Sequence, residues 1–247
     1  MTFHPTSGGA IPGNPMTTLG DMIYENSQPT AARLAGNTSA AKQFLTQTGT
    51  GAVSAAPAWG TIANSDLPYV APWIPADNGL LVATNDPALS TSNSIFIGGT
   101  LYLAKLMIRE AITATNLWVN IEATGNNTGG SGGTFAGLYS SAGALLTGSS
   151  DVASSLVTTG PVSLAFTTPQ ALSAGTFVWA AILCNLGTTQ PTVFKNVGNV
   201  AGAADVGLTA ATRRWAVNGT GLAALPSPSI TPGNNLVTTI TWWAGIS

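Results

Sequence analysis

The sequence predicts an all-β protein, and three observations lead to this class. Short runs of β-branched and aromatic residues are separated by clusters of Gly, Ser, Thr, Asn and Pro, which is typical of strands joined by tight turns. Several runs alternate apolar and polar residues with the period of two that marks a half-buried strand. No segment shows the apolar period of a helix of three turns or more.

The composition limits what such a protein can do. Of its 247 residues only 6% are charged, whereas an ordinary soluble domain has about 25%. The basic residues are scattered apart from the pair Arg213-Arg214, so the chain lacks the basic stripe that a nucleic-acid binder or a polybasic membrane anchor needs. One histidine and one cysteine exclude zinc sites built from several such ligands, and we expect no metal and no cofactor.

The first 19 residues predict an extended docking arm. They contain three prolines and several glycines and have too few apolar residues for a core of their own. The start of the chain has neither the basic nor the apolar region of a signal peptide. The longest apolar run, residues 177–184, is shorter than the about 20 residues that a spanning helix needs, so we expect no membrane insertion.

Residues 20–70 predict short strands that require neighbouring chains. Apolar clusters of two to four residues are separated by turn-forming residues, and a region this sparse cannot bury a sufficient core alone. Copies of the same chain are the simplest neighbours. Residues 31–46 resemble a helix at first sight, but residues 36–39 interrupt the pattern and favour strands. The expected shared core consists of Ile23, Tyr24, Leu34, Phe44, Leu45 and Trp59.

A proline-rich linker at residues 71–76 predicts a domain boundary, followed by a head at residues 77–247. Leu117, Val119 and Ile121 alternate with more polar residues, and residues 176–184 are apolar on both faces, as in a central strand. Residues 101–109 and 236–243 predict further strands, and residues 136–139 and 144–147 predict a hairpin. About eight short strands fit a β-sandwich of jelly-roll type.

Tryptophans are the first candidates for a ligand site in the head. Trp215 follows Arg213 and Arg214, and an indole beside two guanidinium groups can hold a polar or anionic ligand. Trp118 and Trp243 stand opposite the aliphatic stripes of their predicted strands, where they could stack on a sugar. Packing in the core or against a second chain is the alternative for all of these residues.

Catalysis has one candidate pair, Glu110 and Glu122. A glycosidase needs two carboxylates facing each other across a cleft, and this pair could meet if its strands were neighbours. The alternative is that both are exposed charges that keep sheet edges soluble.

Residues 19–67 carry a family resemblance. The clusters Leu-Gly-Asp-Met-Ile-Tyr at 19–24, Pro-Thr-Ala-Ala-Arg-Leu-Ala at 29–35, Gln-Phe-Leu-Thr at 43–46 and Pro-Ala-Trp-Gly at 57–60 resemble a segment of bacteriophage tail-fibre and minor tail proteins. The resemblance implies a homotrimer with a short intertwined β-stalk at residues 20–70, and an arm at residues 1–19 that attaches to other virion proteins. Residues 39–42 depart from the glycine-rich turn that the family often has there.

Together these features predict a virion structural fibre protein whose head binds a host-surface glycan without catalysis. A decoration fibre or an injection-particle protein without a receptor role is the first alternative. A glycan depolymerase that uses Glu110 and Glu122 is the second.

Overall fold

The chain divides between Pro72 and Trp73 into two units. The computed structural model describes residues 16–25, 31–50, 53–62, 66, 73–90, 93–126, 133–194 and 203–247. Residues 1–15 of the predicted docking arm lie outside the described residues. The second unit begins before the predicted start of the head at residue 77, because the Trp73 indole donates to Asn78 Oδ1 (2.6 Å) beside the 3₁₀ helix η2 (Pro75–Asn78).

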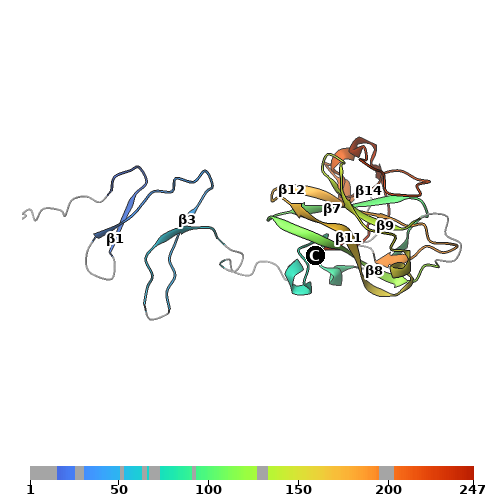
Figure 1. The fold of residues 1–247 in the computed structure, drawn as a ribbon, viewed down its shortest axis with the longest axis horizontal. Helices are drawn as coiled ribbons and strands as arrows, with labels where there is room; N and C mark the ends of the chain where they lie inside the picture. The colour runs from blue at the N-terminus through green and yellow to red at the C-terminus, as the bar shows by residue number, and fades with distance from the viewer. Residues whose placement is uncertain are drawn as a thin grey trace, which may run out of the picture. The chain divides into compact units, whose positions relative to one another are not determined.

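Two short hairpins form the first unit (Figure 1). Strand β1 (Met22–Glu25) pairs with β2 (Ala31–Leu34), and β3 (Phe44–Thr46) pairs with β4 (Ala58–Gly60), both antiparallel. The strands expected over residues 20–70 are therefore confirmed, and residues 31–46 contain no helix. The Trp59 indole donates to the Ala35 carbonyl (2.6 Å) and joins the second hairpin to the end of the first.

Two antiparallel sheets form the second unit, which confirms the predicted β-sandwich class (Figure 1). In the order of the sheet, the first contains β10 (Leu145–Gly148), β9 (Phe135–Ser140), β12 (Thr176–Leu183), β7 (Leu101–Ile108), β14 (Trp215–Val217) and β15 (Leu236–Val237). The second contains β5 (Val82–Ala83), β16 (Gly245–Ile246), β8 (Ile112–Ala123), β13 (Thr192–Phe194) and β6 (Asn93–Ile95). A further strand, β11 (Gly160–Leu172), also pairs with β8.

All helical segments of the described residues are 3₁₀ turns of five residues or fewer. Besides η2 they are η3 (Pro87–Leu89), η4 (Ala153–Val157), η5 (Ala203–Asp205), η6 (Ala210–Thr212) and η7 (Pro232–Asn234). Within the parts of the chain that the structure describes, no helix is long and apolar enough to cross a membrane.

The main core lies between the sheets and follows from the alternation in the strands. On β8 the side chains of Leu117, Val119 and Ile121 are buried, as predicted, while the residues between them reach the surface to a greater degree. On β12 both faces are buried, as predicted for a central strand, because β12 lies between β9 and β7 and has apolar layers on both sides.

A second apolar layer covers the outer face of the first sheet. Leu101 and Leu103 of β7, Tyr139 of β9 and Trp179 of β12 point to this face. The chain segment after β14 lies over them, and its residues Leu222, Leu225 and Ile230 complete the layer. This cover explains why the central strands have no polar face.

The longest strand, β11, is not among the strands that the sequence predicts. Val162, Leu164 and Phe166 are buried and alternate with exposed neighbours, so the period of two is present in the sequence. Pro161 and Pro169 make the segment look like a turn. Pro161 is the second residue of the strand. Pro169 lies within residues 166–169, which have no partner in β8, so its missing N–H is not required there.

The prediction of a single strand at residues 236–243 is wrong. Residues 236–237 form β15 in the first sheet, whereas residues 245–246 form β16 in the second. The segment between them crosses from one sheet to the other, and it buries Trp242 completely in the core. Its β-branched and aromatic residues therefore reflect burial on all sides and not one continuous ladder.

Candidate functional site

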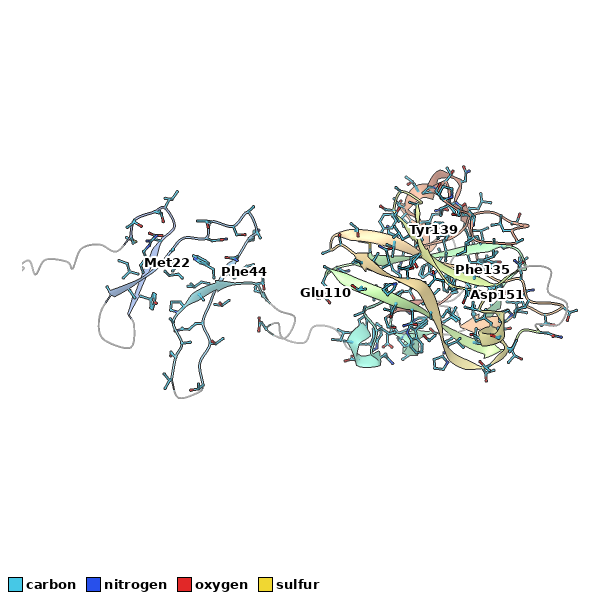
Figure 2. The ribbon with its side chains drawn as sticks, viewed as in Figure 1. Met22, Phe44, Glu110, Phe135, Tyr139 and Asp151 are labelled. Atoms are coloured by element: carbon cyan, nitrogen blue, oxygen red, sulfur yellow. The ribbon has the colours of Figure 1, made fainter. Side chains whose placement is uncertain are left out.

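The first unit exposes the apolar side chains that the sequence assigns to a shared core. Ile23 is 46% exposed, Phe44 44% and Leu45 49%, while Tyr24, Leu34 and Trp59 are partly exposed. Figure 2 shows the position of Phe44 on the second hairpin. Exposed Leu, Ile and Phe side chains in a group, without a core beneath them, are typical of a surface that another chain covers. The hairpins are therefore a candidate interface.

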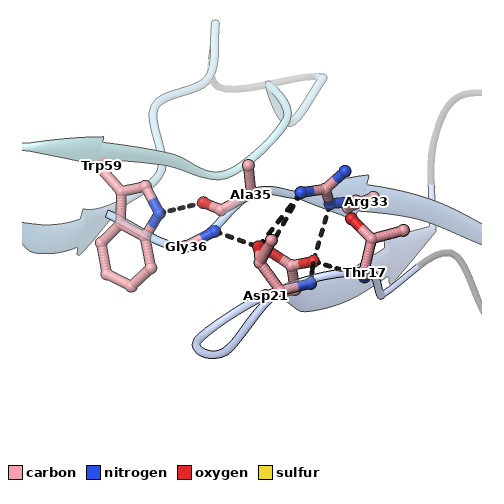
Figure 3. Close-up of polar contacts among 7 residues, drawn as sticks. Thr17, Asp21, Arg33, Ala35, Gly36 and Trp59 are labelled. Atoms are coloured by element: carbon pink, nitrogen blue, oxygen red, sulfur yellow. Dashed lines mark hydrogen bonds and ion pairs between the residues drawn. The ribbon is translucent and has the colours of Figure 1, made fainter. Parts of the chain in front are cut away.

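A buried carboxylate organises these hairpins (Figure 3). Asp21 accepts hydrogen bonds from the amides of Thr17 (2.7 Å), Thr18 (2.8 Å) and Gly36 (2.8 Å), and from the Thr18 hydroxyl (2.7 Å). Arg33 of β2 pairs with it at 2.8 Å. Burial of the Asp21 carboxyl by itself would raise its pKa, but the hydrogen bonds from Thr18, Gly36 and Thr17 together hold this pKa well below its ordinary value.

The predicted tryptophan site is not assembled on the surface. Trp215 is 3% exposed and its indole donates to the Trp242 carbonyl (3.0 Å), and Trp243 is 6% exposed and donates to the Asn85 carbonyl (2.9 Å). Trp118 is half-buried and donates to Ser247 Oγ (2.9 Å). Each indole N–H is thus used inside the fold, and Trp243 packs in the core, which is the alternative that the sequence left open.

The two arginines of that prediction differ in role. Arg213 donates to the Asn235 carbonyl through Nη1 (2.5 Å), and its Nε lies 3.7 Å from Asp205 Oδ2, an ion-pair distance too long for a hydrogen bond. Arg214 is exposed, and its Cζ lies 4.7 Å from the centre of the Trp215 ring. Its guanidinium has no hydrogen-bond partner among the described residues. Arg213 is structural, whereas Arg214 is free to meet a ligand.

Lys105 is a further cation beside Arg214, and the sequence did not predict it as a site residue. Its Nζ donates to the Thr212 carbonyl (3.2 Å) and lies 4.3 Å from the centre of the Phe177 ring. Partial burial lowers the pKa of its amino group, the charge of Arg214 lowers it further, and the Asp205 carboxylate raises it. The signal in the sequence is that Lys105 is the one charged residue in the otherwise apolar run of β7.

A polar pocket of about 390 Å³ lies at the other end of β7. Glycines make up much of its wall, together with Asn185 and Gln190. The Asn185 amide group donates to the carbonyls of Gly133 (3.1 Å) and Leu222 (2.9 Å), and Gln190 exchanges two hydrogen bonds with the backbone of Leu186. These side chains hold loops together, so the wall offers a ligand few free polar groups.

The carboxylates do not form the pair that glycoside hydrolysis requires. Glu110 precedes β8 and Glu122 lies near its end, so a strand of about 30 Å separates them, far beyond the about 10 Å of a glycosidase pair. Figure 2 shows Glu110 and Asp151 at opposite ends of the second unit. The described residues contain no group of three side chains that could hold a metal ion.

No protein-family model and no curated protein sequence matches this chain. Function has to be inferred from its own residues. Two groups of residues are candidates for a functional surface: the exposed apolar side chains of the first unit, and Lys105, Arg213 and Arg214 in the second.

Proposed function

We propose that this chain is a structural fibre protein of a bacteriophage particle, in which the first unit assembles with two further copies and the second unit is displayed as a receptor-binding head. The observation that carries the proposal is the exposed apolar surface of the first unit. Ile23, Phe44 and Leu45 each have close to half of their surface in solvent. The resemblance of residues 19–67 to bacteriophage tail-fibre and minor tail proteins supports the same assignment.

Burial of these side chains between copies would stabilise the assembly. Complete burial of one Ile, Leu or Phe side chain contributes about 1.5–3 kcal/mol, and half of that is still to be gained at each position here. Two of the charged groups beside these side chains, Asp21 and Arg33, already form an ion pair. Contact with a second copy would leave neither charge of this pair without a partner.

The second unit is suited to exposure on the particle surface, because it has a core of its own that requires no partner chain. Three heads on one fibre and several fibres on one particle would convert weak contacts with a host-surface glycan into strong attachment. The mechanism would be multivalent binding without catalysis, and the place of action would be the virion.

One observation favours the alternative of a decoration fibre or an injection-particle protein without a receptor role. Among the side chains of the second unit that the structure describes, each aromatic ring is buried or only partly exposed. A broad aromatic platform, which many sugar sites use for stacking, is therefore not found in this part of the chain. A glycan array distinguishes the two roles, because a decoration fibre would bind none of its members.

Light scattering of the full chain at micromolar concentration tests the proposal. We expect the mass of three chains. A monomer would overturn the proposal, since it would leave the apolar surface of the first unit in water. Antibody labelling of phage particles would then locate the protein, and its absence from the particle would contradict the assignment to the virion.

A further inference from the structure

The outer face of the first sheet has one end that the apolar cover does not reach. Lys105 and Met107 follow Leu101 and Leu103 on the same side of β7, because side chains alternate along a strand. In the register of the sheet, Lys105 lies opposite Trp179 and Met107 opposite Phe177. Met107 is 46% exposed, whereas Leu101 and Leu103 are fully buried under the cover.

Two cations border this uncovered end. The Lys105 amide donates to the Arg214 carbonyl (2.8 Å), which places the two residues side by side at the start of β14. Lys105 lies above the Phe177 ring, and Arg214 lies above the Trp215 ring. Both side chains are thus held by aromatic rings, which reduces the entropy that they would lose when a ligand binds.

The positive charge here is only partly neutralised within the described residues. Lys105, Arg213 and Arg214 carry three positive charges, and Asp205 is the carboxylate that meets them, through Arg213 Nε (3.7 Å) and the Arg214 amide (2.8 Å). Lys105 is affected by this excess of positive charge, because burial and the nearby Arg214 both lower the pKa of its amino group. An anion placed between Lys105 and Arg214 would relieve their repulsion.

We propose that Lys105 and Arg214 bind the carboxylate or phosphate group of an acidic saccharide, with its C–H groups on Met107 and the rim of Phe177. This inference rests on the proposed role of the head as a receptor-binding module and names the class of its ligand. Two neighbouring cations beside an exposed apolar side chain suit one anionic group on a compact ring, and Lys105 keeps further N–H donors besides the one that it gives to the Thr212 carbonyl. A nucleic-acid strand would need a longer row of cations.

The test uses the full chain and three probes at one fixed ionic strength, because salt screens exposed charges. The probes are methyl glucuronide, glucose 6-phosphate and the uncharged methyl glucoside, and binding is followed by amide NMR shifts of β7 and β14. We expect binding of at least one acidic probe and none of the neutral probe. Which acid binds shows whether the natural ligand carries a carboxylate or a phosphate.

Matched variants locate the site. Arg214→Gln should weaken acid binding by roughly fivefold or more, because it removes one charge-assisted contact. Lys105→Gln should have a similar effect, and Lys42→Gln, which removes an exposed cation of the first unit, should have none. Thermal unfolding verifies that each variant is folded, and Arg214→Gln is safe in this respect because the side chain is exposed.

Three results would overturn the inference: no acidic probe binds, the neutral probe binds equally well, or Lys42→Gln weakens binding as much as Arg214→Gln. None of these results depends on the number of chains in the particle. A trimer that ignores acidic saccharides would refute this site alone, and a monomer that binds them would refute the fibre assignment alone.

Discussion

At the scale of single residues, one buried carboxylate explains how a unit without a large core holds its shape. Asp21 accepts hydrogen bonds from backbone amides that precede β1 and follow β2, and it forms an ion pair with Arg33 of β2. Its side chain has no exposed surface, so each of these contacts replaces a hydrogen bond that water would make. Asp21 therefore determines the path of the chain into and out of the first hairpin.

The low pKa of Asp21 leads to a pH prediction. Because the pKa in the folded chain lies below the ordinary value of 3.8, the folded state keeps its carboxylate charged where the unfolded state already binds a proton. The stability that Asp21 contributes is present above about pH 4 and is lost as the pH falls towards its folded pKa. We expect carbon NMR of the Asp21 carboxyl to show a midpoint well below 3.8.

Asp21→Asn is the matching substitution. It removes the charge and one acceptor oxygen, so hydrogen exchange of the Gly36 amide should become faster at neutral pH. Asp77→Asn is the control, because Asp77 bonds to Ile74 in the other unit and should leave Gly36 unchanged. A midpoint at or above 3.8, or an unchanged Gly36 amide, would refute this role of Asp21.

At the scale of elements, the β9–β10 hairpin shows how a turn is bound to a distant segment. Gly143 has a positive φ of 91°. Its N–H donates to the Ser140 carbonyl in the turn, and its carbonyl accepts a hydrogen bond from the Ile230 amide in the covering segment. A Cβ at this position would collide with the Ile230 carbonyl oxygen and with the Pro232 ring. Glycine alone can adopt the left-handed backbone and also leave room for the Ile230 carbonyl and the Pro232 ring.

Gly143→Ala should therefore destabilise the second unit. The strained backbone costs roughly 1–3 kcal/mol, and the collision adds to it. Gly233→Ala is the matched control, because its Cβ would meet open space at an ordinary φ, and we expect a change within about 0.5 kcal/mol. Urea unfolding followed by tryptophan fluorescence measures both variants, and equal midpoints would contradict this account of the turn.

At the scale of the whole molecule, the two units obtain their stability in different ways. The second unit buries a core between its sheets and an additional layer outside one of them. The first unit leaves its apolar side chains exposed and relies on polar contacts around Asp21. A change in one unit should consequently have little effect on the other.

The double variant Ile23→Asp, Phe44→Asp tests this division of roles. Charge at these two apolar positions should shift the mass in light scattering from the trimer towards the monomer, because an unpaired carboxylate opposes burial between copies. The head should keep its thermal transition in calorimetry. Leu164→Ala should do the reverse, lowering the stability of the head by about 2–5 kcal/mol and leaving the trimer intact.

Val53→Asp is the control within the first unit, since Val53 is exposed but lies outside the six residues of the expected shared core. It should remain trimeric. If Val53→Asp dissociates the chains as readily as the double variant, the shared core is wrongly placed. If the double variant lowers the head transition, the two units are not independent.

The sequence by itself determined the fold class, the strands of strong alternation and the sparse apolar clusters of the first unit. These depend on local properties, such as the period of two in Leu117, Val119 and Ile121, and the turn residues between the strands. Only the tertiary structure decided which residues share a surface. Lys105 meets Arg214 because β14 pairs with β7. Trp179 is buried beneath the covering segment, and Trp215 is buried against the crossing segment, where its indole donates to the Trp242 carbonyl. Such neighbours are set by pairing between distant strands, for which single-chain periodicity carries no information.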